Sequence, residues 1–137
     1  MPKVCGILET ASYVKDLATS ATFYRRLFGF PTLLESDRLI ALDVAGKSVL
    51  LLFQEGATSE SFATPGGVIP GHAGAGPTHF AFSIDRDAVS DWRACLLAER
   101  VAIESEVNWE GGAQSIYFRD PDQTLVELIT RGFWTIY

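Results

Sequence analysis

The sequence has no apolar run that approaches the ~20 residues a membrane-spanning helix needs. Basic residues are also scarce, since 11 Lys and Arg stand against 17 Asp and Glu and leave a formal net charge of −6. This balance repels phosphate backbones and anionic lipid, so we expect neither nucleic acid nor a membrane surface as a partner. The first residues lack the apolar stretch of a secretory signal peptide, which indicates a cytoplasmic protein.

Cysteine is nearly absent, with only Cys5 and Cys95 in 137 residues. Two thiols make neither a disulfide framework nor a zinc knuckle, which agrees with a reducing cytoplasm and leaves open a single bridge between them. The chain length suits one compact domain, and a composition of 47% hydrophobic and 20% charged residues is that of an ordinary globular protein.

The chain repeats one order of elements twice: a strand, a helix and three strands. Asp16 is expected to cap the first helix and Gly29 to end it; Asp85 or Asp87 is expected to cap the second. An offset of 70 residues superimposes the two passes and sets Glu9 against His79. The predicted strands are 4–14, 31–35, 38–45 and 47–54 in the first pass, and 77–84, 101–107, 113–119 and 124–130 in the second.

The segment 55–76 between the two passes is rich in glycine and proline and shows little periodicity. A stretch of this length without regular structure is either a lid over a site or a disordered linker. Phe62, Val68 and Ile69 would give a lid something to bury, so the sequence favours a lid.

Alternation along the strands places three polar groups where apolar side chains are expected. His79 and Glu127 take the parity opposite to the large apolar residues of their strands, and Glu9 lies among Ile7, Leu8 and Ala11. A buried carboxylate needs a partner. Imidazole and carboxylate on neighbouring strands can converge on a divalent ion, and such donors suit manganese, iron, nickel, cobalt or zinc.

Three segments together resemble the vicinal-oxygen-chelate superfamily of glyoxalases, bleomycin-resistance proteins and extradiol dioxygenases. They are Leu8–Gly29 (LETASYVKDLATSATFYRRLFG), Pro77–Phe82 (PTHFAF) and Ser115–Leu128 (SIYFRDPDQTLVEL). The resemblance implies an α+β fold in which two βαβββ modules form a curved mixed sheet around a cavity. It implies one domain over 1–137, with module one at about 4–54, a loop at about 55–76 and module two at about 77–131. It also implies a homodimer.

The family's metal ligands lie on the first and last strands of the modules, and these positions correspond to Glu9, His79 and Glu127. Two departures are notable. Many members have His where Glu9 stands, and the last strand of module one, around Leu50, offers no ligand. The second departure argues against a typical glyoxalase I. The three-ligand pattern is closer to the extradiol-dioxygenase and fosfomycin-resistance branches.

The sequence therefore predicts a metal-dependent enzyme that binds a small oxygenated substrate through vicinal oxygens, as a lyase, isomerase, transferase or extradiol dioxygenase. Tyr117 and Arg119 share the predicted cavity face and are the candidates for orienting substrate. The alternative is a metal-free protein of the bleomycin-resistance type that sequesters a drug or metabolite.

Each candidate also has a structural interpretation. Glu9 can be a buried carboxylate satisfied by a backbone amide or an arginine, and His79 a satisfied core histidine. Glu127 can be the ion-pair partner of Arg119 or Arg131. His72, in the glycine-rich segment, is interpreted as a solvated side chain.

Overall fold

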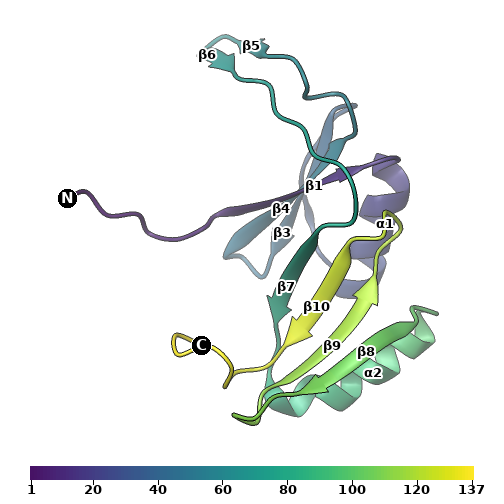
Figure 1. Cartoon of the computed structure of the whole chain (residues 1–137). Helices are drawn as coiled ribbons and strands as arrows, with labels where there is room; N and C mark the ends of the chain where they lie inside the picture. Colours follow the sequence, from purple (N-terminus) through teal and green to yellow (C-terminus); the bar gives the residue numbers. More distant parts are fainter. The chain divides into compact units, whose positions relative to one another are not determined.

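A computed structural model describes all residues from 1 to 137 and divides them into two compact units, Met1–Ala75 and Gly76–Tyr137. Each unit contains a four-stranded mixed sheet and one main helix (Figure 1). The strand orders β1-β4-β3-β2 and β7-β10-β9-β8 show that both units have the same topology. The predicted α+β fold of two βαβββ modules is confirmed. None of the helices has the length and hydrophobicity that crossing a membrane would require.

The bounds of the elements follow the predicted order. The first unit holds β1 (Glu9–Val14), α1 (Leu17–Phe28), β2 (Thr32–Glu35), β3 (Leu39–Val44), β4 (Ser48–Gln54), β5 (Phe62–Thr64) and β6 (Gly67–Ile69). The second holds β7 (His79–Ser83), the 3-10 helix η1 (Arg86–Ala88), α2 (Val89–Ala98), β8 (Ile103–Asn108), β9 (Gln114–Arg119) and β10 (Leu125–Ile129). The strand predicted over 4–14 begins only at Glu9. Its parallel partner β4 begins at Ser48, so the preceding residues have no strand to pair with.

Helix α1 begins and ends as predicted. The Asp16 side chain accepts a hydrogen bond from the Thr19 backbone N–H at 2.7 Å, which satisfies one donor of the first turn. Gly29 adopts a left-handed conformation (φ 69°) and donates its N–H to the Arg25 carbonyl. The apolar stripe is buried, as the spacing predicted, and Tyr24 is fully enclosed.

The N-terminus of helix α2 has no side-chain cap, so the predicted cap by Asp85 or Asp87 is wrong. The chain first forms η1, in which the Ala88 N–H bonds to the Asp85 carbonyl at 3.1 Å. The 3-10 turn leads directly into α2, and no side chain caps either helix. The Arg93 guanidinium on α2 pairs with Glu106 on β8 at 2.8 Å, and α2 runs along that strand (Figure 1).

The faces of the second sheet follow the predicted parity. β10 pairs in parallel with β7 and antiparallel with β9. One face carries the fully buried Ile116, Phe118, Val126 and Leu128. Ser115, Tyr117 and Glu127 alternate with these residues and therefore share the opposite face.

The offset of 70 residues relates the starts of the first strands of the two units. Glu9 begins β1 and His79 begins β7, and each of these strands lies at the edge of its sheet in parallel with the last long strand of the unit. Glu9 pairs with Val49 and His79 pairs with Leu125. Two residues beyond these partners stand Leu51 on β4 and Glu127 on β10. Leu51 is therefore the counterpart of Glu127 in the first unit.

The segment 55–76 has regular structure, so the expectation that it has none is wrong. β5 and β6 form a short antiparallel ribbon that extends away from the four-stranded sheet of its own unit (Figure 1). The apolar side chains of the ribbon (Phe62, Val68 and Ile69) are exposed. The base of the segment is closed by two reciprocal bonds: the His72 N–H to the Thr58 carbonyl at 2.7 Å, and the Thr58 hydroxyl to the His72 carbonyl at 2.8 Å.

Candidate metal centre

The second unit brings two of the predicted ligands together. His79 Nε2 lies 3.3 Å from Glu127 Oε2. The other ring nitrogen, Nδ1, lies 2.8 Å from the Leu125 carbonyl oxygen. Because a carbonyl oxygen can only accept, Nδ1 must carry a proton and donate it. This contact fixes the orientation of the ring and directs Nε2 at the carboxylate.

Glu127 is buried, with 6% of its surface exposed, and its two oxygens have different partners. Oε1 accepts the Ser115 hydroxyl at 2.6 Å and the Tyr117 hydroxyl at 2.9 Å. Oε2 faces only the imidazole of His79. No arginine takes part, so the interpretation of Glu127 as the partner of Arg119 or Arg131 is wrong.

The facing atoms of His79 and Glu127 constrain what can lie between them. With its proton on Nδ1, a neutral imidazole presents a lone pair at Nε2 to a carboxylate oxygen, and two lone pairs at 3.3 Å repel each other. Either a proton on Nε2 or a cation removes the repulsion. Two donors each about 2.1 Å from an ion, at an angle of about 100°, lie about 3.2 Å apart. The spacing and the donor types therefore fit a shared divalent ion as well as a shared proton.

Tyr117 lies beside this pair. Its ring centroid is 6.4 Å from that of His79, and its hydroxyl donates to Glu127. Burial raises the pKa of Tyr117, and the hydrogen bond to the Glu127 carboxylate raises it further. Tyr117 is therefore a neutral phenol at physiological pH and acts as a hydrogen-bond donor.

Arg119 is already engaged by other groups. Its guanidinium binds the Glu104 carboxylate at 2.6 and 3.2 Å and donates to the Gln123 carbonyl at 3.0 Å. The ion pair with Glu104 raises the pKa of Arg119 and lowers that of Glu104. A substrate anion would have to compete with Glu104 for this guanidinium.

Glu9 belongs to the first unit, as the first residue of β1. Its side chain is exposed, so the interpretation of Glu9 as a buried carboxylate is wrong. The structure contains no cluster of three or more His, Cys, Asp and Glu side chains, so the ligand pair gathered within one unit is His79 with Glu127.

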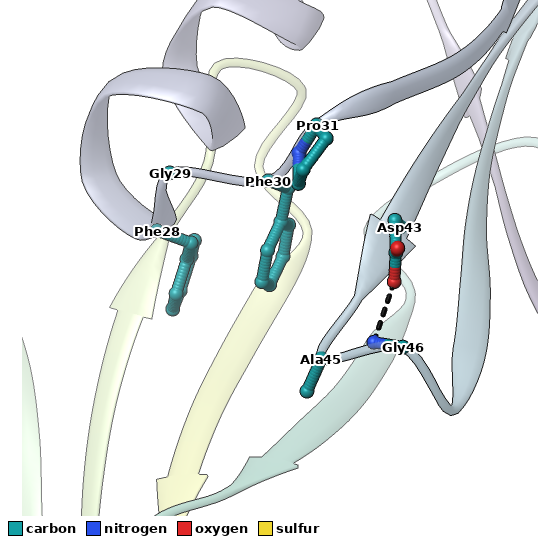
Figure 2. A pocket seen from close by; sticks show the side chains of 7 residues that line it. All are labelled: Phe28, Gly29, Phe30, Pro31, Asp43, Ala45 and Gly46. Carbon is teal, nitrogen blue, oxygen red and sulfur yellow. Dashed lines mark hydrogen bonds between the residues drawn. The ribbon is translucent and has the colours of Figure 1, made fainter.

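The first unit contains a separate hollow of about 310 Å³ that none of the predicted site residues lines. Figure 2 shows the rings of Phe28 and Phe30 side by side on one wall and Asp43 on the other. The two rings stack at 4.9 Å, while Asp43 accepts the Gly46 N–H at 2.6 Å. This carboxylate stabilises the turn between β3 and β4 and is the only ionisable group of the lining.

Two polar contacts were missed from the sequence. Ser115 was placed on the correct face but given no role; its shared parity with Tyr117 and Glu127 was the signal. His72 was interpreted as solvated, whereas its Nδ1 is hydrogen-bonded to the Tyr13 hydroxyl at 2.6 Å. No local pattern could have indicated that contact, because it joins positions far apart in the sequence.

Comparison with known proteins gives one family. Residues 6–128 match the model of the Glyoxalase/Bleomycin resistance protein/Dioxygenase superfamily. The metallothiol transferase FosB of Bacillus licheniformis is 29% identical over 93% of this chain and 77% of its own. The catechol-2,3-dioxygenase of Bacillus subtilis is 28% identical over 84% of this chain but only 38% of its own.

A solved structure agrees in both fold and sequence. The crystal structure of a lactoylglutathione lyase from Agrobacterium tumefaciens has a TM-score of 0.88 and 32% identity, over 98% of this chain and 99% of that one. The family model covers most of the sequence, and the repeated βαβββ topology agrees with it. The chain belongs to the Glyoxalase/Bleomycin resistance protein/Dioxygenase superfamily.

Proposed function

We propose that this protein is a metal-dependent enzyme with His79 and Glu127 as two of its ligands and Glu9 as the third. The observation that carries the proposal is the 3.3 Å approach of His79 Nε2 to Glu127 Oε2, with Nδ1 tied to the Leu125 carbonyl. Ligating histidines generally donate their other ring N–H in this way. Glu9 is supported by its position, because it begins β1 as His79 begins β7.

The proposed substrate is a small molecule with two neighbouring oxygens. A bound divalent ion would act as a Lewis acid that stabilises negative charge on such oxygens. The donor set of one imidazole and two carboxylates suits manganese, iron, nickel, cobalt or zinc. Tyr117 would keep its proton and offer a hydrogen bond to a substrate oxygen, in addition to holding Glu127. Arg119 would orient substrate only after release from Glu104.

The reaction type is proposed as a lyase, isomerase, transferase or ring-cleaving dioxygenase. Relatives are named as a thiol transferase, a dioxygenase and a lactoylglutathione lyase. Leu51, the counterpart of Glu127 in the first unit, cannot coordinate a metal. For that reason we propose a three-ligand centre, unlike the four-ligand arrangement expected of a typical glyoxalase I.

The modules are proposed to form one domain over 1–137 and to work as a homodimer in the cytoplasm. Leu33 and Leu34 on the edge strand β2 are more than half exposed and offer apolar surface to a second copy.

The alternative function is a metal-free protein that sequesters a drug or metabolite. A shared proton between His79 and Glu127 would favour that alternative.

A thermal-shift titration with manganese, iron(II), nickel, cobalt and zinc tests the proposal. An ion present at a hundred times its dissociation constant stabilises the folded state by about 2.7 kcal/mol, which raises the Tm by several degrees. His79→Ala, Glu127→Gln and Glu9→Gln should each reduce or abolish the shift. His72→Gln, which alters the other histidine, should keep it. No shift for the wild-type protein with any of the ions would favour the sequestering alternative.

A further inference from the structure

The two oxygens of Glu127 are distinguished by a chain of hydrogen bonds that begins outside the ligand pair. The Trp109 indole N–H donates to the Ser115 hydroxyl oxygen at 2.8 Å, and the Ser115 O–H donates to Glu127 Oε1 at 2.6 Å. Ser115 is 1% exposed, so water does not compete for these contacts. The chain ends on the carboxylate whose other oxygen faces His79.

The direction of this relay follows from the chemistry of its members. An indole N–H can only donate, so Ser115 must accept from Trp109. The hydroxyl has a single proton, and this proton is then left for Glu127 Oε1. Neighbouring hydrogen bonds in a buried chain polarise and strengthen one another. Loss of the indole N–H would therefore free the Ser115 hydroxyl to rotate and weaken its hold on Oε1.

Trp109 is itself held in place at the turn between β8 and β9. Its backbone N–H bonds to the Ala113 carbonyl, and its carbonyl accepts the Gly112 N–H, both at 2.9 Å. Its ring packs on Phe133 with centroids 4.4 Å apart. Gly111 approaches the Gly132 carbonyl so closely that a Cβ would lie 2.5 Å from that oxygen. The turn and the C-terminal segment thus fix the start of the relay.

We propose that Trp109 and Ser115 are positioning residues for Glu127. Ser115, held by Trp109, engages Oε1 together with Tyr117 and leaves Oε2 as the only oxygen presented to His79, so that Glu127 would be a monodentate ligand. The inference rests on the proposed metal centre and adds two residues that do not touch the ion. Phe133 also contributes to this positioning, because its ring packs against the Trp109 ring.

The test is the affinity of the purified full chain for zinc or manganese alone, measured by calorimetry. Removal of a residue that hydrogen-bonds to a metal ligand typically lowers metal affinity 10- to 100-fold. Ser115→Ala should weaken binding by about this factor, and Ser115→Thr, which keeps the hydroxyl, should restore most of it. Trp109→Phe keeps a ring against Phe133 but lacks the N–H, and we expect a loss of roughly two- to tenfold in affinity, the worth of about one hydrogen bond.

The control is Trp134→Phe. Trp134 is exposed, packs against Phe133 with ring centroids 4.8 Å apart and is not part of the relay, so its variant should bind as the wild type does. If Ser115→Ala and Trp109→Phe change only the Tm and leave the affinity unchanged, the positioning role is refuted while the metal centre stands. If the wild type itself binds no ion, the proposed function fails. Trp109→Phe also keeps the test available should Ser115→Ala fail to fold.

Discussion

His79 and Glu127 meet across β7 and β10 although the strand register does not pair them. His79 stands opposite Leu125, and Glu127 stands opposite Ala81, yet their Nε2 and Oε2 atoms are 3.3 Å apart. The imidazole reaches diagonally along the sheet face and is anchored on the Leu125 carbonyl. This contact adds a side-chain link between the first and last strands of the second unit, which already pair in parallel, at the proposed metal centre.

Tyr117 is expected to titrate above the pH range of an exposed tyrosine. Its pKa is raised by burial and by the hydrogen bond to Glu127. A raised pKa means that this contribution to stability is present below the unfolded value of about 10 and is lost as the pH rises through the folded value. Ultraviolet titrations near 295 nm of the wild type and Tyr117→Phe should differ by one phenolate step, and this step should lie above the unfolded value of about 10. A Tyr117→Phe variant that loses an early step instead would contradict the assignment.

His72 and Tyr13 are expected to hold the base of segment 55–76. The Tyr13 hydroxyl and His72 Nδ1 are hydrogen-bonded at 2.6 Å, and the His72 ring packs on Phe53 with centroids 4.7 Å apart. A Cβ at Gly74 would lie 2.5 Å from the Tyr13 ring, so the segment passes very close to it. One hydrogen bond is worth about 0.5–1.5 kcal/mol, so His72→Phe should raise amide exchange over 58–74 by roughly two- to tenfold.

The matched variant for this contact is Tyr13→Phe, which removes the same bond from the other side. Hydrogen-exchange mass spectrometry should show equal effects for the two single variants and no further increase in the double variant. Additive effects would mean that the hydrogen bond between Tyr13 and His72 does not hold the segment.

Gln123 is expected to be a position where glycine stabilises the protein. It ends the turn that Asp120 organises by accepting the N–H groups of Asp122 and Thr124, and its φ is 65°. A left-handed conformation costs a side chain about 1–2 kcal/mol, part of which the backbone entropy of glycine offsets. Gln123→Gly should therefore raise the free energy of unfolding by about 0.5–1 kcal/mol in a denaturant titration. Gln123→Ala, which retains a Cβ, should give no gain.

The ion pairs of β8 are expected to weaken in acid. Arginine partners lower the pKa of both Glu104 and Glu106. Stability from a lowered pKa is present above the unfolded value, about 4.3, and is lost as the pH falls through the folded one. The Tm difference between the wild type and Glu106→Gln should therefore shrink between pH 5 and pH 3. A constant difference over this range would show that the pair with Arg93 contributes nothing.

Periodicity and capping rules predicted most of the fold. Alternation separated Phe118 and Val126 from Tyr117 and Glu127, and the Asp16 and Gly29 signals fixed α1. The predicted start of β1 was wrong because its parallel partner β4 begins only at Ser48. The sequence of β1 itself does not show where its partner begins. The cap of α2 was wrong because a 3-10 turn can supply backbone acceptors in place of an aspartate side chain.

The candidate site was predictable in part. Parity placed His79 and Glu127 on one face, since both alternate with the large apolar residues of their strands. Their diagonal contact and the relay from Trp109 depend on side-chain reach and on a turn geometry that spacing does not encode. The role of Glu9 as the third ligand stays a prediction.

The most direct measurement is anomalous diffraction from crystals of the protein grown with manganese or zinc. We expect one anomalous peak within about 2.0–2.3 Å of both His79 Nε2 and Glu127 Oε2, with a carboxylate oxygen of Glu9 completing the protein ligands. A map with no peak there, and His79 bound directly to Glu127 through a proton, would contradict the metal centre.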